Sequence, residues 1–334
     1  MKFLRKDQPT QYAVHADRPL TNLSVAVLQG DDSFVVPQVF PVIGVQKQSD
    51  TYYTYPKGMF LRDQMAKRAD GTLAQEIGYS VSTDNYRCDV WAIAHRIGDQ
   101  RRANTDAPLA PDREAMMLLT KQRMIRQDRE WGANYFTTGV WARDRTGVAS
   151  GPTGLQFLRF DVGGSTPIEL IDEEKTLMVA RSGFEPNTLV MDRKTWGVLR
   201  NHASVVDRIK YTGSSENPAK VELMALAALF GVPKIIVAKS IYNSAVEGQA
   251  DSIGFIHGTG MLLLYVAPSA GLMTPTAGLT FNWDGLMSGA GVGGQAITRW
   301  RDQPRRSDVI ELESAFDMKV VATELGTFFA TPVS

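Results

Sequence analysis

The chain has 334 residues, of which 43% are hydrophobic, so it is long enough for roughly two domains with a sizeable buried core. Lys plus Arg and Asp plus Glu each number 36, and this zero net charge argues against a dedicated nucleic-acid binder, which usually carries a basic excess. The single cysteine, Cys88, excludes an internal disulfide and a cysteine-based zinc site. No apolar run has the length of a signal peptide or a membrane span, so the sequence predicts a soluble, intracellular product.

Residues 1–78 carry apolar patches and aromatic side chains without the pattern of a self-contained core. Prolines and glycines interrupt the apolar runs of residues 1–60, and no helical stripe is sustained there. Residues 47–78 are more polar, with a cluster of tyrosines followed by basic side chains. Such a long segment is an uncommon loop in a compact domain, and it is too aromatic for an ordinary disordered linker. We therefore predict that it becomes ordered by packing against another surface.

The next segment predicts a strand and then a long helix. Residues 79–98 have the period-two pattern of an extended strand, and residues 111–138 form a helix that opens with a proline and acidic side chains. Two apolar rows follow this helix at seven-residue spacing, and Glu114, Lys121 and Asp128 lie between them. The rows are Met117, Met124 and Trp131, and Leu118 and Ile125. A charged row within an apolar face fits a neighbouring surface that supplies opposite charges. The alternative is that these side chains reach solvent at the edge of an ordinary core.

The central region alternates between predicted helices and buried strands. Residues 139–164 are rich in glycine and are expected to form a loop. A helix over 166–181 is expected to begin with a capping box and to stop at Gly183. The elements expected next are a strand at 189–191, a helix capped by Asp192, a short helix at 204–210, a helix at 221–230, and strands at 234–239, 253–257 and 261–267. This alternation predicts a mixed α/β domain.

The C-terminal region predicts a return to the first sheet. Residues 268–296 form an excursion rich in Gly, Pro and Thr. Residues 308–322 then alternate strictly between apolar and charged side chains, which predicts an unusually long, half-buried strand. The expected partner of this strand is the extended segment 79–98. The chain is therefore predicted to leave one sheet, build the α/β domain and return to complete the first sheet.

No constellation of catalytic residues emerges from the sequence. The four histidines are scattered and none lies in an HExxH zinc motif, and His202 is interpreted as a helix-end residue favoured by the helix dipole. The run GAGVGG at 289–294 matches GxGxxG only formally, because no buried strand precedes it and no clear helix follows it. The carboxylates at 172–174 and 311–313 are expected to be solvated. No enzyme activity, cofactor or metal site is therefore predicted.

Several segments together resemble the major capsid proteins of tailed bacteriophages. The similarity is carried by NTLVMDRKTWGVLRNHASVVDRIKY with VELMALAALFGVPKIIVAKSIYN, by MTPTAGLTFNW and by the ending IELESAFDMKVVATELGTFF. This resemblance implies an α+β, HK97-like capsid fold with a long spine helix, a peripheral sheet and an α/β axial domain. The implied parts are an N-terminal arm at 1–45, an extended β-hairpin loop at 46–90, a peripheral domain at 91–164 and 301–334 with the spine helix at 108–138, and the axial domain at 165–300.

The resemblance implies a head protein that assembles, as hexamers and pentamers, into an icosahedral shell around viral double-stranded DNA. The protein would be assembled in the host cytoplasm and located in the virion. Its leading segment would then be stable only when packed head-to-tail on neighbouring copies. Zero net charge fits the packing of many copies. The candidate subunit-interface residues are Tyr52, Tyr53, Tyr55, Arg62, Arg68, Glu114, Lys121 and Asp128.

Beyond other copies of the chain, the implied partners are a portal, a separate scaffolding protein, a decoration protein and packaged DNA contacted non-specifically. No membrane partner is expected. A separate scaffolding protein is expected because no charged helical leader precedes the arm, and no autocatalytic cross-link is expected because no Lys–Asn pair is identifiable. Two alternatives stay open. One is an encapsulin-type bacterial nanocompartment shell, distinguished by its enzyme cargo, and the other is a cytosolic α/β enzyme that uses the 289–294 loop.

Overall fold

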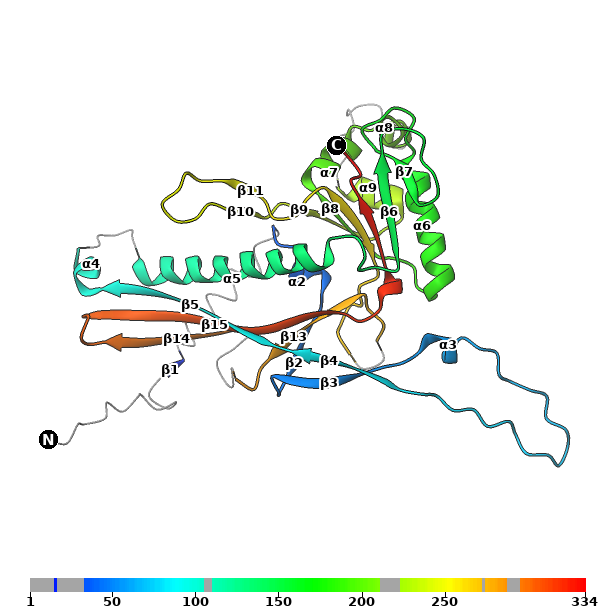
Figure 1. Cartoon of the computed structure of the whole chain (residues 1–334), viewed down its shortest axis with the longest axis horizontal. Coiled ribbons are helices and arrows are strands. Elements are labelled where there is room, and N and C mark those ends of the chain that lie inside the picture. The colour runs from blue at the N-terminus through cyan, green and yellow to red at the C-terminus, as the bar shows by residue number, and fades with distance from the viewer. Residues whose placement is uncertain (1–14, 17–32, 105–109, 211–222, 272–273, 287–294) are drawn as a thin grey trace.

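Figure 1 shows the computed structural model of the chain, which describes residues 15–16, 33–104, 110–210, 223–271, 274–286 and 295–334. Two six-stranded sheets form the body, and a long hairpin projects from it. Among the described helices, none combines the length and the apolar character needed to cross a membrane.

The first sheet, called the peripheral sheet here, is organised around β15 (Ser307–Val320). One side of β15 pairs antiparallel with β14 (Gln295–Asp302) and then with β13 (Gly278–Trp283), and the other side pairs antiparallel with β5 (Asp89–Gly98). Beyond these, β1 (His15–Ala16) pairs with β14, and β2 (Val42–Val45) runs parallel to β13. The predicted pairing of the C-terminal strand with the segment before the long helix is therefore confirmed.

The long helix α5 (Pro111–Tyr135) packs along one face of the peripheral sheet. Ala115, Met116 and Leu119 are buried against side chains of β5, β14 and β15. Of the two predicted apolar rows, Met117 and Leu118 are exposed at the start of the helix, whereas Met124 and Trp131 are buried further along. The helix is confirmed, but its buried face at the N-terminal end is rotated by one residue from the predicted rows.

The second sheet, called the axial sheet here, has two buried faces. Its strand order is β7 (Gln156–Leu158), β6 (Arg143–Val148), β16 (Gly326–Ala330), β12 (Gly260–Leu264), β8 (Thr188–Asp192) and β9 (Lys234–Ala238). One face packs on α6 (Pro167–Ser182), α7 (Arg193–Arg200), α8 (Ala203–Lys210) and α9 (Leu223–Phe230). The other face packs against Trp131, Phe136 and Phe40, so this cluster joins the axial sheet to the spine helix.

Sheet membership differs from the predicted ranges in two places. The predicted loop at 139–164 contains β6 and β7, which lie in the axial sheet, as does β16. The predicted excursion at 268–296 contains β13 and the start of β14, which lie in the peripheral sheet. These two predictions are wrong because polar, glycine-containing sequence hides short strands, whose conformation is set by pairing with other strands, as β6 pairs with β16 and β13 with β2.

The segment that enters β2 is packed on the body of its own chain. Residues 34–36 and 39–40 are buried, and α2 (Val36–Val39) lies among them. The ring of Phe40 meets Trp131 edge-on at 6.0 Å between centroids. Gly278 makes room for Phe40, because a Cβ at position 278 would lie 2.4 Å from its ring. The prediction that this segment needs a neighbouring copy is therefore wrong for residues 34–40; residues 1–14 and 17–32 lie outside the described residues.

Helix ends follow the sequence signals with one exception. Asp192 Oδ1 accepts from the backbone amides of Lys194 and Thr195, as predicted, and Gly183 ends α6 in the left-handed region at φ 79°. The predicted capping box at the start of α6 is absent, because the Thr166 side chain makes no cap hydrogen bond. Glu169, the expected partner in that box, instead binds Arg208 at 2.8 Å.

Candidate assembly interface

The extended hairpin begins as a paired ribbon that is anchored to the peripheral sheet. β3 (Ser49–Thr54) and β4 (Ser82–Arg87) are antiparallel over their full length. Tyr86 stacks on Phe281 of β13 at 4.7 Å between ring centroids, and Tyr52 packs on the same ring at 5.3 Å. The Tyr52 hydroxyl donates to Asp84 at 2.8 Å, and burial, with this bond, raises the pKa of Tyr52. The base of the hairpin is therefore fixed to its own chain.

Beyond this ribbon the hairpin extends far from the body (Figure 1). A small cluster of Tyr55, Phe60 and Tyr79 holds its two limbs together, with ring centroids 6.2 Å apart. Lys57 Nζ binds Glu324 at 2.8 Å and donates to the carbonyl of Arg181, which ties the first limb to α6 and to the turn before β16. Between residues 61 and 79 almost every side chain is exposed.

The exposed part of the hairpin is rich in large apolar side chains. Met65 and Leu73 are each 96% exposed, and Leu61, Ile77 and Tyr79 are about two-thirds exposed. Soluble monomers rarely expose contiguous apolar surface of this kind, which marks interaction sites. This segment, residues 55–81, is called the hairpin tip below. It is the strongest candidate for a surface that is covered on assembly.

The five predicted interface residues of the hairpin divide between its base and its tip. Tyr52 is half-buried on Phe281 and belongs to the base. Tyr53 lies on the exposed face of β3, and Tyr55 opens the tip. Arg62 and Arg68 are exposed on the tip, where Arg68 donates to the carbonyl of Thr72. Tyr53, Tyr55, Arg62 and Arg68 therefore stay candidates for contacts between copies.

The three predicted helix residues have different surroundings. Glu114 is exposed at the start of α5, with Oε1 3.4 Å from the amide of Ala110. Lys121 is exposed, and its ammonium lies 4.9 Å from the ring centroid of Phe34. Asp128, by contrast, is fully buried and has no surface to offer to a neighbour. The prediction of an interface role for Asp128 is corrected by this burial.

Asp128 forms a junction inside the chain. Oδ1 accepts from the amides of Val35 and Val36 at 3.0 and 3.1 Å, and Oδ2 lies 2.6 Å from Ser240 Oγ and 3.1 Å from His257 Nε2. One carboxylate on the long helix α5 thus binds the segment that contains Val35 and Val36. It also binds Ser240 and His257, which flank the β10–β11 hairpin. A carboxylate with four such partners is satisfied without an ion from outside.

The contact between Ser165 and His202 lacks the polarity of an activated nucleophile. Ser165 Oγ lies 2.9 Å from His202 Nε2, but the hydroxyl donates to the carbonyl of Val162 at 2.8 Å. Nδ1 of His202 accepts from the amide and hydroxyl of Ser204, so Nε2 carries the proton and donates to Ser165. Burial lowers the pKa of His202. In this arrangement the His202 imidazole donates to the Ser165 hydroxyl and helps to cap a turn. A general base would instead have to accept the proton of that hydroxyl.

Of the carboxylates predicted to be solvated, some are buried or half-buried. Glu174 is fully buried, with Oε1 2.9 Å from Arg143 Nε and 2.7 Å from Arg145 Nε. This ion pair ties α6 to β6. Glu311 and Glu313 are half-buried, and burial raises the pKa of Glu311. Across the described part of the chain, no three side chains are grouped as a metal site would need; the 289–294 loop lies outside it.

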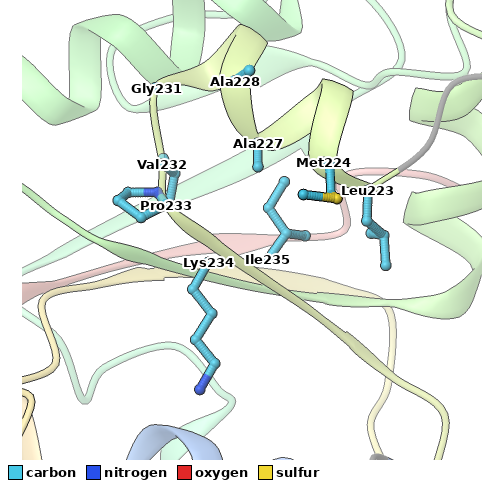
Figure 2. Close-up of a pocket in the computed structure, with 9 residues that line it drawn as sticks. All are labelled: Leu223, Met224, Ala227, Ala228, Gly231, Val232, Pro233, Lys234 and Ile235. Carbon is cyan, nitrogen blue, oxygen red and sulfur yellow. The ribbon is translucent and has the colours of Figure 1, made fainter.

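An open groove of about 540 Å³ lies between α9 and β9. Its lining is almost entirely apolar, and Figure 2 shows the one charged side chain, Lys234, directed away from the apolar residues. Lys234 Nζ donates to the carbonyl of Gln38 at 3.1 Å, and burial lowers its pKa. Small-molecule sites combine an apolar lining with several convergent polar groups, and this groove has no such set.

Comparison with solved structures defines the class of fold. The chain aligns with a phage-related protein from Bordetella bronchiseptica RB50 at a TM-score of 0.71 and 19% identity, covering 96% of this chain and 98% of that one. It aligns with the capsid of cyanophage P-SCSP1u at 0.54 and 10% identity, covering 89% and 88%. An encapsulin from Synechococcus elongatus PCC 7942 aligns at 0.51 and 13% identity, covering 92% and 94%. The fold is therefore the α+β, HK97-like fold of viral capsid and encapsulin shells.

Sequence comparison finds similarity to a phage capsid protein over part of the chain. The chain is 30% identical over 108 residues to the major capsid protein of Burkholderia phage BcepMu. The aligned segment covers 32% of this chain and 33% of that protein, so it spans about a third of the relative's length. No protein-family model matches the sequence.

Proposed function

We propose that this chain is a phage major capsid protein that assembles with copies of itself into an icosahedral shell around double-stranded DNA. The capsid fold and the similarity to a phage major capsid protein support this function. The observation that carries it is the hairpin tip, which exposes Met65 and Leu73 almost completely and is stabilised only if another surface covers it. On this reading the protein is a virion component with a structural role.

Within that function, the predicted parts of the subunit take on roles in the shell. The hairpin tip, with Tyr53, Tyr55, Arg62 and Arg68, would lie on a neighbouring copy. Glu114 and Lys121 would contribute on the exposed side of the spine helix. Hexamers and pentamers built by such head-to-tail contacts close into rings, and rings tile into a shell. A portal, a scaffolding protein, a decoration protein and non-specific DNA contacts complete the proposed set of partners.

Electron microscopy of the purified protein tests assembly directly. We expect closed shells from the unaltered chain, either alone or with a coexpressed scaffolding protein. A variant in which residues 61–79 are replaced by a short Gly/Ser linker should fold, as judged by circular dichroism, but should form no shells. Shell formation by this variant at the wild-type yield would refute the role of the hairpin tip.

The encapsulin alternative rests on the shared fold and differs in the contents of the particle. Particles from the natural producer should contain double-stranded DNA that is protected from nuclease. An enzyme cargo without DNA would favour the nanocompartment. For the enzyme alternative, isothermal titration with nucleotides is the test, and we expect no binding.

A further inference from the structure

A second exposed apolar surface lies on the side of the molecule opposite to the hairpin tip (Figure 1). β10 (Ile241–Asn243) and β11 (Ile253–Phe255) form an antiparallel two-stranded hairpin beside α5. Ile241 pairs with Phe255, and Asn243 pairs with Ile253. Directly paired residues share one face of a ladder, so Ile241, Ile253 and Phe255 form one apolar face. They are 52, 65 and 48% exposed, and this face is called the outer face below.

The opposite face of this small hairpin is held by the spine helix. The guanidinium of Arg129 on α5 lies 4.6 Å from the ring centroid of Tyr242. At the base of the hairpin, the amide of Ile256 donates to the carbonyl of Ser240 at 3.0 Å and closes the ribbon. An isolated two-stranded hairpin is at best marginally stable in water. Anchoring on one face positions the apolar outer face for a second layer.

The charges of this hairpin and of the hairpin tip are complementary. Residues 240–256 contain Glu247 and Asp251, both exposed, and no lysine or arginine. Asp251 Oδ1 also accepts from Asn243 Nδ2 at 2.7 Å, which orients the carboxylate beside the outer face. Residues 57–68, the first limb of the hairpin tip, carry four cations (two Lys, two Arg) and one Asp. Lys57 is paired with Glu324 of its own chain, so an excess of two positive charges remains for a partner.

Apolar and basic side chains alternate along this first limb. Phe60, Leu61 and Met65 are exposed between and beside the cations. A limb with this composition can cover an apolar face while its cations meet carboxylates at the rim, which is how interfaces combine a hydrophobic centre with charged edges. Within one molecule this limb and the β10–β11 hairpin lie on opposite sides of the body, so they can meet only between copies.

We propose that the outer face of the β10–β11 hairpin is the docking surface for residues 57–68 of a second copy. Phe60, Leu61 and Met65 cover the apolar face, while Arg62 and Arg68 pair with Glu247 and Asp251. The two surfaces differ and lie at opposite sides of the molecule, so the contact is heterologous and repeats from copy to copy around a ring. This inference rests on the proposed function and names the receptor for the hairpin tip.

Cysteine cross-linking tests the contact. The paired variant Arg68→Cys/Glu247→Cys should form a ladder of linked chains on non-reducing electrophoresis of assembled particles. Native Cys88 is buried and does not compete. The matched control is Arg305→Cys/Glu247→Cys, which also joins two exposed positions but is not predicted to form a contact. An equal yield of ladders from both pairs, or no ladder from the first, would overturn the proposal.

Charge reversal provides a second test that separates this proposal from the function on which it rests. Arg62→Glu/Arg68→Glu should slow shell assembly at least tenfold by light scattering, and adding Glu247→Lys/Asp251→Lys should restore most of the rate. Unaltered protein that never forms shells would refute the capsid function itself. Shells from the unaltered protein, with a charge-reversed variant that assembles normally or is not rescued, would refute only the docking surface.

Discussion

Replacement of Asp128 should destabilise the subunit more than any exposed substitution on the spine helix. Asp128→Ala removes four hydrogen-bonding contacts and leaves the amides of Val35 and Val36, the Ser240 hydroxyl and His257 Nε2 without their acceptor. Each buried donor left unsatisfied costs about 1–3 kcal/mol, and relaxation or entry of water recovers part of the sum. We expect a loss of about 3–5 kcal/mol in the free energy of unfolding, as for other broken buried charge networks.

Hydrogen exchange provides the specific readout for this change. Amide protection over residues 33–40 should fall in Asp128→Ala, because the segment loses its anchor on the helix. The control is Glu130→Gln on the same helix, which breaks a partly exposed pair with Arg126 and should cost less than about 1 kcal/mol. Urea denaturation at fixed protein concentration compares the two variants. Unchanged protection over 33–40, with a loss similar to that of the control, would refute the junction.

Three further predictions concern single groups. Gly132→Ala should destabilise the subunit despite the higher helix propensity of alanine, because the added Cβ would lie 2.9 Å from His257 Nδ1. The control is Gly197→Ala, whose Cβ would meet nothing within 4 Å and which should stabilise the subunit by about 0.5–1 kcal/mol. Thermal melts of the two variants measure both effects. Cys88, whose pKa burial raises to about 12, should resist a thiol reagent at pH 8 until the protein is unfolded, and rapid labelling of native protein would contradict this. Hydrogen bonds from arginines lower the pKa of Asp308, so its contribution to stability is present above pH 3.8 and is lost as the pH falls further. Asp308→Asn should therefore flatten the acid limb of a plot of stability against pH. An unchanged acid limb would contradict this prediction.

The parts of the fold that could be predicted carry local signals. β8 and α7 follow from an apolar run, a capping aspartate and helical spacing, and β15 follows from strict alternation. These signals depend only on neighbouring residues. β6 is different: its sequence, RDRTGV, is polar and contains glycine, and it becomes a strand through parallel pairing with β16, distant in the sequence. Pairing of that kind leaves little trace in the strand itself.

The candidate interface was predictable only in part for a related reason. A long aromatic segment without its own core indicates an interface role for the tyrosines and arginines of residues 52–68, and the structure places most of them on a projecting hairpin. Asp128 shares a row with Glu114 and Lys121, and spacing along the helix cannot reveal which turn meets other parts of the chain. Gly132, one turn further on the same face, was the available signal, since a small residue there permits the close approach of His257.

β15 and β16 occur late in the sequence, yet each sits inside one of the two sheets. β15 joins β5, β13 and β14, and β16 joins β6 to β12. A nascent chain therefore cannot complete either sheet until residues 307–330 have left the ribosome. Long-range pairing of this kind is slow and follows synthesis. Products truncated before residue 307 consequently lack the strand that joins the two halves of each sheet, and only partial sheets such as β12–β8–β9 can pair in them.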